Sequence, residues 1–366
     1  MNILEVIIAK FWVKILDLLT YRLNSKINKI TYISYVSNKL PQNMKLISDS
    51  IKKLDQKYEE VYLTIKYSNS ILDKIRYVIE IAKQIYHIKT SSVVIIDGNN
   101  FVISNIDKKN TKVIQIWHAC GAIKKFGNDF KRKYDIKNYD YIITSSSKSK
   151  AIMASAFGVK EEQVLPLGCA RTDILFNKNK MNKYKKAMYS KYPEFKSKKV
   201  ILYAPTFRGE GIYDKDFLDI DLDKISKILG KEYILLHKHH PIINIKHRYL
   251  EENVYDVSHE SLYKLFSITD ILVSDFSAII YDFSILEKNM IFYVPDLKEY
   301  KRNRGLYIDY EEFVPGDIVY DEDGLAKNIL DGKCNIKKIR EFKYDFFDFL
   351  DGKSAKRIAK FIDSIL

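Results

Sequence analysis

Short runs of apolar and β-branched residues alternate along this chain with longer segments in which apolar residues recur every three or four positions. The short runs predict strands, and the longer segments predict helices. Several runs are apolar at almost every position, as expected of parallel strands that are buried on both faces. In the first half of the chain, strands are predicted at 29–37, 61–67, 92–97, 112–117, 139–144 and 164–167.

The same alternation restarts near Lys199 and predicts further strands at 200–204, 233–237, 254–257, 271–273 and 290–294. Strands and helices that alternate twice over indicate two doubly wound α/β domains. The expected organisation is a helix at 1–23, a first domain at 24–176, a linker at 177–198, a second domain at 199–350, and a last helix at 351–366 that packs on the first domain.

The first helix is amphipathic. Its apolar stretch is interrupted by Glu5, Lys10, Lys14 and Asp17, which excludes a typical spanning helix, and its flanks do not fit a signal peptide. At 100° per residue the four charges fall on one side, and the other side carries Phe11, Trp12, Ile15, Leu18 and Leu19. Such a helix either lies on a membrane surface or packs on the protein's own core. Both interpretations stay open, and the basic composition favours the membrane.

The net charge of +14 favours anionic partners. The basic residues are dispersed in short clusters, so each cluster is equally consistent with a solvated surface, and we find no RNA-binding module. The three cysteines are far apart and show no zinc-binding spacing, which favours a reducing cytoplasm over a disulfide scaffold. Walker, GxGxxG, HExxH and nucleophile-elbow motifs are absent from the sequence. We therefore expect no metal site and no cofactor, and a requirement for Mg²⁺ stays open.

Polar side chains follow several predicted strands, at the end where open α/β sheets bind ligands. His118 follows the fourth strand, and a histidine can take the proton of a hydroxyl nucleophile near neutral pH. Gly121 and Gly127 allow close approach of a ligand to the backbone, and Lys124 offers charge to a phosphate. A hydrogen-bonded structural histidine is the alternative.

Two further turns carry candidate phosphate ligands. Thr206 and Arg208 follow the strand at 200–204, and arginine is suited to bidentate phosphate binding. A surface turn with an exposed arginine is the alternative. Ser274, Asp275 and Ser277 follow the strand at 271–273 and precede a helix, where backbone N–H groups can bind an anion. Here the alternative is helix capping without a ligand.

Residues 237–240 carry three histidines and Lys238. Metal binding is a rival interpretation, but neighbouring side chains of an extended segment point to opposite sides, and no carboxylate accompanies them. We favour His240, beside Pro241, as a ligand of a pyrophosphate.

Together the motifs resemble the CDP-glycerol glycerophosphotransferase family of teichoic-acid and capsule synthesis. The matching segments occur in the family's order over roughly residues 30–330; they are WHACGAIKKFG at 117–127, GCARTD at 168–173, APTFRG at 204–209, His240-Pro241 and SDFSAIIYDF at 274–283.

The resemblance implies a GT-B-like fold, in which two Rossmann-like domains face across a cleft and the second domain holds the donor. It also implies transfer of glycerol phosphate or ribitol phosphate from CDP-glycerol or CDP-ribitol to a lipid-linked or polymer acceptor, with release of CMP. Such an enzyme works at the cytoplasmic face of the cell membrane as a peripheral protein. The expected partners are the CDP-alditol, the acceptor and an anionic membrane surface, and not nucleic acid.

The resemblance also assigns roles to residues. His118 matches the family's base, which takes the proton of the acceptor hydroxyl before its oxygen attacks phosphorus, and His240 matches a pyrophosphate ligand. The residues expected to bind substrate are Gly121, Lys124, Arg171, Thr206, Arg208, Lys238, Ser274, Asp275, Ser277 and Asp282. Asp275 and Asp282 are expected to orient neighbouring groups, because carboxylates repel phosphate.

This sequence has WHACG where many family members have WHG, and SDFSA where TDYSS is common, so the donor stays open. Glycerol-phosphate transfer from CDP-glycerol is the predicted function. The alternatives are ribitol-phosphate transfer from CDP-ribitol and a GT-B glycosyltransferase that uses a nucleotide sugar. A non-enzymatic binder of nucleic acid or membrane would leave the polar strand ends unexplained.

Overall fold

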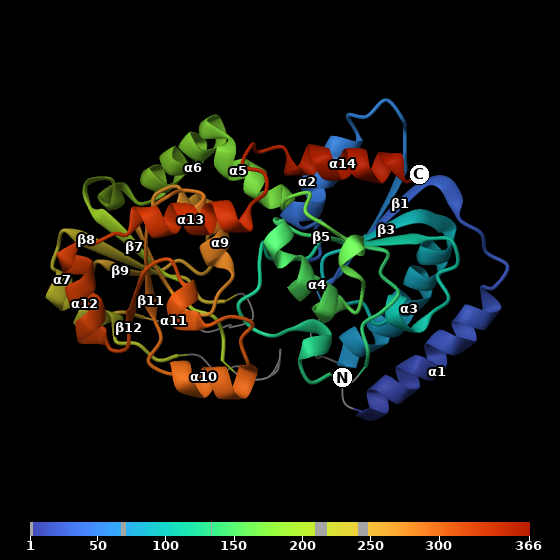
Figure 1. The fold of residues 1–366 in the computed structure, drawn as a ribbon, viewed down its shortest axis with the longest axis horizontal. Helices are drawn as coiled ribbons and strands as arrows, with labels where there is room; N and C mark the ends of the chain where they lie inside the picture. Colours follow the sequence, from blue (N-terminus) through green and yellow to red (C-terminus); the bar gives the residue numbers. More distant parts are fainter. Residues whose placement is uncertain (1–2, 67–70, 133, 209–217, 241–247) are drawn as a thin grey trace. The chain divides into compact units, whose positions relative to one another are not determined.

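The computed structural model describes residues 3–66, 71–132, 134–208, 218–240 and 248–366 (Figure 1). Its contacts divide the chain into two compact units. Unit 1 consists of Met1–Gly121, Phe126–Asp173 and Phe346–Leu366, and unit 2 consists of Ala122–Lys125 and Ile174–Asp345. The four residues Ala122–Lys125 therefore belong to unit 2, although both of their flanks belong to unit 1.

Unit 1 is built on a six-stranded parallel sheet with the order β2-β1-β3-β4-β5-β6. The six strands overlap the six predicted from the sequence; they are β1 Lys26–Ser34, β2 Glu59–Thr64, β3 Ser91–Ile96, β4 Lys112–Gln115, β5 Tyr141–Ile143 and β6 Val164–Leu165. Its helices are α1 Ile3–Leu19, α2 Gln42–Ile51, α3 Ile71–Thr90, α4 Lys150–Phe157 and α14 Ser354–Ser364.

Alternate residues of each central strand enter different cores, because successive side chains of a strand point to opposite faces. Val94 and Ile96 of β3 join a cluster with α1, α3 and α4, whereas Val93 and Ile95 join a cluster with α2 and α14. Both faces of the sheet are thus covered, which explains the nearly continuous apolar runs. The last helix, α14, packs on unit 1 against α2.

Unit 2 contains a second six-stranded parallel sheet, with the order β12-β11-β10-β7-β8-β9. Its strands are β7 Lys199–Tyr203, β8 Tyr233–His237, β9 Val254–Asp256, β10 Ile271–Ser274, β11 Asn289–Tyr293 and β12 Asp317–Val319. The remaining helices are α5 Asp173–Phe176, α6 Lys178–Lys191, α7 Leu222–Leu229, α8 Leu262–Phe266, α9 Ile279–Ser284, α10 Leu297–Arg304, α11 Tyr310–Phe313, α12 Glu322–Asp331 and α13 Ile336–Phe346. The fold class predicted from the sequence, α/β with two doubly wound sheets, is confirmed.

Two elements of unit 2 were not predicted. The segment at 177–198, expected to be a linker, forms α6 and a 3₁₀ turn at Pro193–Ser197, and Asn177 caps α6 by accepting a hydrogen bond from Lys180 N at 2.9 Å. Lysine is a good helix former, and its abundance here conceals a helix that is apolar on one side only. Strand β12, which has three residues and begins with the exposed Asp317, was also not predicted.

Each sheet has one point at which the strand order reverses, and such points bind ligands in open α/β sheets. In unit 1 the chain runs from β1 outward to β2 and then returns to β3 on the other side of β1. In unit 2 it runs from β7 to β8 and β9 and returns to β10 on the other side of β7. The switch points therefore lie between β1 and β3, and between β7 and β10.

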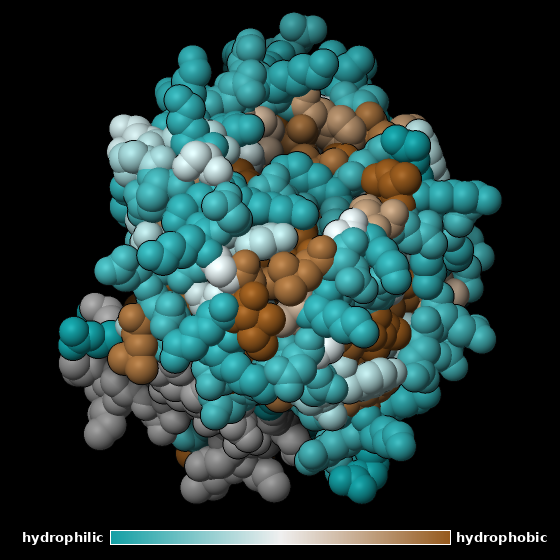
Figure 2. Space-filling model, turned by 90° about the vertical axis from the view of Figure 1, so that its left-hand side faces the viewer, coloured by the Kyte–Doolittle hydropathy of each residue, from teal (hydrophilic) through white to brown (hydrophobic). Residues whose placement is uncertain are grey.

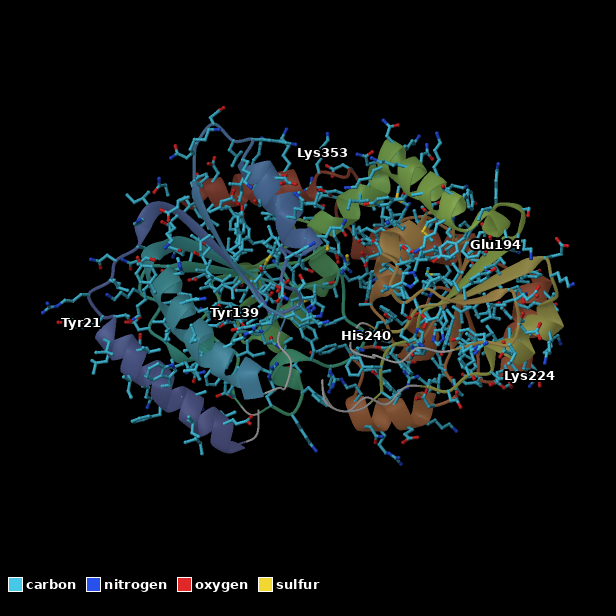
Figure 3. The ribbon with its side chains drawn as sticks, turned by 180° about the vertical axis from the view of Figure 1, so that it is seen from behind. Tyr21, Tyr139, Glu194, Lys224, His240 and Lys353 are labelled. Carbon is cyan, nitrogen blue, oxygen red and sulfur yellow. The ribbon has the colours of Figure 1, made fainter. Side chains whose placement is uncertain are left out.

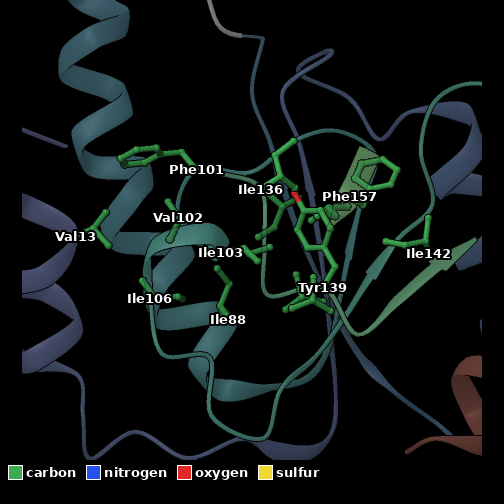
Figure 4. Close-up of a cluster of buried hydrophobic side chains, with 14 of the residues drawn as sticks. Val13, Ile88, Phe101, Val102, Ile103, Ile106, Ile136, Tyr139, Ile142 and Phe157 are labelled. Atoms are coloured by element: carbon green, nitrogen blue, oxygen red, sulfur yellow. The ribbon is translucent and has the colours of Figure 1, made fainter. Parts of the chain in front are cut away.

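Helix α1 lies on unit 1 with one face buried and one exposed. Val6, Ala9 and Val13 are buried in the cluster that also contains Phe101 and Val102 (Figure 4). Ile7, Ile8, Phe11, Leu18 and Leu19 are 59% to 72% exposed. No helix within the described residues is both long and apolar enough to cross a membrane.

The side of unit 2 that carries α7 and α12 exposes fewer large apolar residues than α1 does. Figure 2 shows mostly hydrophilic residues on it, and its hydrophobic residues lie in separate patches. Ile228 of α7 and Leu330 of α12 are the exposed large apolar residues of these two helices.

Candidate active site

The turn after β4 holds His118 in place through strained backbone. Trp117 has a positive φ of 48°, an uncommon conformation for a bulky residue. Its N–H donates to Gln115 Oε1 at 2.9 Å, and its carbonyl accepts from Asn43 Nδ2 at 3.1 Å. Its ring packs against Phe126 and Phe157 at centroid distances of 4.8 and 5.2 Å. Strain of this kind persists only where the surroundings impose it, and it is frequent at active sites.

His118 is exposed, and one of its ring nitrogens is anchored to the backbone. His118 Nδ1 lies 3.1 Å from the carbonyl oxygen of Asp97. Because a carbonyl can only accept a hydrogen bond, Nδ1 carries the proton, and Nε2 of the neutral ring holds the lone pair. This tautomer is the one that a general base requires.

Arg171 belongs to the same assembly in unit 1. Its backbone N–H donates to Asn43 Oδ1 at 3.0 Å, and its guanidinium donates to the carbonyl of His118. Asn43 thus joins the turn of His118 to the segment at 168–173. Within this segment Asp173 accepts hydrogen bonds from the backbone N–H groups of Ser354 and Ala355 at 2.9 and 2.8 Å, so its side chain caps α14.

The two glycines of the His118 segment differ in their surroundings. Gly127 has a φ of +63°, and a Cβ there would lie 2.1 Å from the carbonyl oxygen of Ala156. Its glycine is therefore required for packing within unit 1. Gly121 is buried at the end of the first stretch of unit 1, and its role towards a ligand stays a prediction.

Asp97 was not singled out from the sequence, although it ends the apolar run at 92–97. It follows β3 at the switch point of unit 1, is 4% exposed, and accepts a hydrogen bond from Ser34 Oγ at 2.9 Å. Burial raises the pKa of Asp97 to about 6, against the effect of the Ser34 hydrogen bond, which lowers it. Asp97 has a buried carboxyl with a raised pKa, and its backbone carbonyl contacts the ring of His118. It is therefore a candidate site residue.

The turn after β7 in unit 2 is held by the buried carboxylate of Asp275. Asp275 Oδ1 accepts from the backbone N–H of Thr206 at 2.8 Å, and Oδ2 accepts from Arg208 Nη1 at 2.7 Å. Arg208 Nε and Nη2 donate to the two carboxylate oxygens of Asp296 at 2.6 and 3.0 Å. The ends of β7 and β10 are therefore tied together at the switch point.

Arg208 is largely occupied by the protein. Besides its bonds to two carboxylates, Nη1 donates to Thr206 O at 3.0 Å, so at least four of its hydrogen bonds are made within unit 2. Its guanidinium lies 5.3 and 4.9 Å from the ring centroids of Phe276 and Tyr300. Arg208 thus links Thr206, Asp275 and Asp296, and its contact with phosphate stays a prediction.

The serine and aspartate residues of the segment at 274–283 have different partners. Ser274 Oγ donates to Ala204 O at 2.9 Å, which adds a second link between the ends of β7 and β10. Asp282 is buried and accepts a hydrogen bond from the hydroxyl of Tyr263. Ser277 is half-buried, with its Oγ 3.5 Å from Ile279 N at the start of α9. The carboxylates of Asp275 and Asp282 thus contact protein donors.

Lys124 enters this site from the segment Ala122–Lys125. The segment is fixed to unit 2 by hydrogen bonds of Lys125 N to Gly305 O at 3.0 Å and of Tyr307 N to Ile123 O at 2.9 Å. Lys124 Nζ donates to Thr206 Oγ1. Burial lowers the pKa of Lys124 to about 7, with Asp275 opposing this effect.

Phe207 brings His240 close to this lysine. Lys124 Nζ lies 5.0 Å from the centroid of the Phe207 ring, and the ring of His240 lies 4.9 Å from the same ring. Figure 3 labels His240 among the side chains of unit 2. The structure thus gathers three predicted residues, Lys124, Thr206 and His240, at the carboxyl ends of β7 and β8. Pro241 and Gly209, which belong to the predicted motifs, lie outside the described residues.

Lys238 points to a different group of atoms. Its Nζ donates to the carbonyls of Ser258 and Glu260 at 3.0 and 2.7 Å, and burial lowers its pKa. His239 N donates to Ser258 Oγ at 3.0 Å, and His237 Nδ1 contacts the hydroxyl of Tyr249. In the described part of the chain, no group of three or more His, Cys, Asp or Glu side chains is arranged to hold a metal.

The comparison with family models decides the relationship. The model described as "CDP-Glycerol:Poly(glycerophosphate) glycerophosphotransferase" matches residues 15–364. This protein belongs to that family. The resemblance inferred from the sequence is confirmed, and with it the expectation of a transferase of polyol phosphate.

Relatives of this glycerophosphotransferase-family protein include a ribitol-phosphate primase and a glycerol-phosphate primase. It is 35% identical to the teichoic acid ribitol-phosphate primase of Bacillus spizizenii, over 93% of this chain and 92% of the relative. It is also 35% identical to the teichoic acid glycerol-phosphate primase of Bacillus subtilis, over 79% of this chain and 77% of that one. Among solved structures, a variant of the wall teichoic acid polymerase TagF matches with a TM-score of 0.76 at 26% identity, over 96% of this chain and 93% of that chain.

We predict that Asp97→Asn stabilises this family member above about pH 6. The pKa of Asp97 is about 6 in the folded state and has an ordinary value of 3.8, so the folded protein binds more protons between these values, and its stability falls as pH rises through this window. The asparagine variant lacks this titration. Its free energy of unfolding relative to that of the wild type should increase by about 3 kcal/mol from pH 4 to pH 6 and then stay constant. Urea unfolding at several pH values measures it.

Ser34→Ala is the matched variant for this test. Because the Ser34 hydrogen bond lowers the pKa of Asp97, its loss should move the window of pH-dependent stability upward. A stability difference between Asp97→Asn and the wild type that does not change with pH would show that the carboxyl does not titrate in this range.

Proposed function

We propose that this protein transfers glycerol phosphate from CDP-glycerol to a hydroxyl of a membrane-associated teichoic-acid or capsule-type precursor, with release of CMP. The observation that carries the proposal is the contact of His118 Nδ1 with the carbonyl of Asp97, which leaves Nε2 as the ring nitrogen that can act as a base towards a hydroxyl nucleophile. The protein also belongs to a family of glycerophosphotransferases. Ribitol-phosphate transfer from CDP-ribitol is the second candidate, because a ribitol-phosphate primase matches 93% of this chain.

In the proposed reaction Nε2 of His118 takes the proton of the acceptor hydroxyl, and the oxygen attacks the phosphorus that carries the alditol. The bond from this phosphorus to the oxygen of CMP breaks, and CMP leaves. Arg171 and Asn43 act through the backbone of the His118 turn, which they hold by hydrogen bonds. They are therefore positioning residues.

The donor's pyrophosphate is proposed to bind in unit 2, at Lys124, Thr206 and His240. Catalysis of phosphoryl-type transfer depends on positioning and on stabilisation of charge more than on covalent chemistry. Lys124 supplies a cation, and the carboxylate of Asp275 holds the Thr206 turn beside it. Ser277 is proposed to add a hydroxyl, while Arg208, Ser274 and Asp282 orient the turns.

A position on the membrane surface is part of the proposal. The exposed apolar face of α1 is accompanied by the exposed basic residues Lys10, Lys14 and Arg22. This combination suits a helix that inserts its apolar face between anionic headgroups. We therefore propose that α1 holds the protein at the cytoplasmic face of the membrane.

The function is tested by calorimetric binding of CDP-glycerol, CDP-ribitol, CMP and UDP-N-acetylglucosamine, followed by transfer assays. We expect one CDP-alditol to bind at least about tenfold more tightly than the UDP-sugar. His118→Ala should leave donor binding unchanged and lower the transfer rate by about 10²- to 10⁴-fold, as expected for loss of a general base.

His259→Ala, at an exposed histidine, is the control and should transfer at the wild-type rate. Binding of the UDP-sugar alone would overturn the family assignment of the donor. Transfer at a normal rate by His118→Ala would overturn the role of the base.

The affinity for the CDP-alditol should depend on pH through Lys124. Below about pH 7 the lysine is protonated and attracts the pyrophosphate, whereas above this pH its charge is lost in the free protein. The dissociation constant should therefore rise with pH above about 7, by up to about tenfold per unit. Calorimetry between pH 6 and pH 9 measures this slope.

Lys124→Arg provides the matched comparison, because arginine stays charged throughout this range. Its affinity should be independent of pH above 7, and Lys124→Gln should bind weakly at every pH. The same slope in Lys124→Arg as in the wild type would assign the titration to another group.

The membrane position is tested by sedimentation with phosphatidylglycerol-containing vesicles. The double variant Phe11→Ser, Leu18→Ser should bind at least about tenfold more weakly, because it withdraws two apolar side chains that are each worth ~1.5 kcal/mol or more when fully buried. Ile228→Ser, Leu330→Ser removes exposed apolar residues from unit 2 and should bind normally. Equal loss in both double variants would exclude α1 as the anchor.

A further inference from the structure

The segment at 177–199 is the most basic part of the chain, and neither the fold nor the proposed chemistry accounts for it. Its 23 residues contain nine lysines and a single acidic residue, Glu194. Most of these lysines lie on α6. The charge is thus concentrated on one 14-residue helix of unit 2.

Contacts fix α6 on unit 2 by its apolar residues and leave its charge at the surface. Met188 is buried, and α6 packs against α8. At the end of the helix Lys191 pairs with the carboxylate of Glu260. Within the described residues none of the other lysines of α6 forms an ion pair; they are Lys178, Lys180, Lys183, Lys185 and Lys186.

Five like charges without carboxylate partners repel one another along a short helix. Lys180 and Lys185 lie over the rings of Tyr184 and Tyr189, at 6.0 and 5.6 Å from the centroids. These contacts orient the side chains and do not neutralise them. A polyanion along the helix would relieve the repulsion and release counterions.

We propose that α6 binds the alditol-phosphate chain that carries the acceptor hydroxyl. This inference rests on the proposed function and deepens it, because it assigns the acceptor chain, a phosphodiester polyanion, to a surface of unit 2. Such a chain offers one negative charge per unit, and the exposed side of α6 offers five cations over about 12 Å of the helix, at 1.5 Å per residue.

The surface of α6 differs from that of a helix that lies on a membrane. Membrane-surface helices bury an apolar face between the lipids. The exposed large apolar residues of the described chain include several of α1 and none of α6. The two basic surfaces are therefore suited to different partners, α1 to lipid and α6 to an anion in water.

Nucleic acid fits α6 less well than a polymer without bases. Proteins that bind single strands combine basic residues with exposed aromatic rings on which bases stack. Tyr184 and Tyr189 are half-buried, and each lies against the amino group of a lysine. The helix therefore provides charge without a stacking surface.

The test compares Lys183→Gln, Lys185→Gln, Lys186→Gln with a control of equal charge, Lys327→Gln, Lys333→Gln, Lys337→Gln on α12, α13 and the turn between them. Glutamine keeps the helix propensity close to that of lysine. The probe is deacylated, end-labelled poly(glycerol phosphate) of about 15 units, and its affinity is measured by fluorescence anisotropy at several salt concentrations. We expect the α6 variant to lose about tenfold in affinity at low salt and about two units of the slope of log K against log salt. The control should lose less than about twofold.

The competing occupants are measured with the same variants. Phosphatidylglycerol vesicles and a labelled single-stranded oligonucleotide replace the polymer, and binding of vesicles should be unchanged in the α6 variant. Equal losses in the α6 and control variants would overturn the proposal, as would a loss of vesicle binding with polymer binding intact. Tighter binding of the oligonucleotide than of the polymer would also overturn it.

Transfer to a monomeric acceptor separates this inference from the proposed function. The α6 variant should transfer to a single lipid-free alditol acceptor at the wild-type rate and should lose its preference for a polymeric acceptor. If the wild type transfers alditol phosphate, but the wild type and the α6 variant bind the polymer equally, the α6 inference fails and the proposed function stands. If the wild type does not transfer from any CDP-alditol, the proposed function fails first.

Discussion

The buried carboxylate of Asp275 organises the candidate donor site of unit 2. It is fully buried, where a charge is stable only with partners, and it has them in the backbone of Thr206 and the guanidinium of Arg208. These bonds join the turns after β7 and β10, and Asp296 binds the other side of Arg208. Removing Arg208 would leave the buried charge of Asp275 without its ion-pair partner, so the geometry of the turn and the stability of unit 2 depend on the same atoms.

In unit 1 the turn of His118 is also held by hydrogen bonds to buried groups, but here the partners are an amide side chain and backbone carbonyls. Asn43 holds the carbonyl of Trp117 and the amide of Arg171, and the carbonyl of Asp97 holds the ring of His118. The group that faces solvent is the one proposed to react, while the buried groups around it keep its position. The raised pKa of Asp97 and the positive φ of Trp117 both cost stability, as is common where a site is organised for function.

The sequence predicted what depends on periodicity. Strand β8 was predicted with its observed ends, and β3 within one residue, because both are buried parallel strands with continuous apolar runs. Helix α6 was missed because its apolar contacts are few and its lysines dominate the pattern. Arg208 is predicted to bind phosphate, but its guanidinium also pairs with Asp296. This residue lies 88 positions away in the chain, and the order of the strands brings it to Arg208. Local sequence indicates which residue types follow a strand, but it cannot show which of these side chains form hydrogen bonds with one another.

The two basic surfaces show how the same charge acquires different uses. On α1 the lysines accompany exposed apolar side chains, so attraction to an anionic surface can be followed by burial of apolar area. On α6 the apolar residues are taken up by unit 2, and attraction to an anion can be followed only by release of counterions. The first interaction therefore survives moderate salt, while the second weakens steeply with it. If both proposals hold, the protein stays on the membrane through α1 while the acceptor chain binds to α6 and leaves.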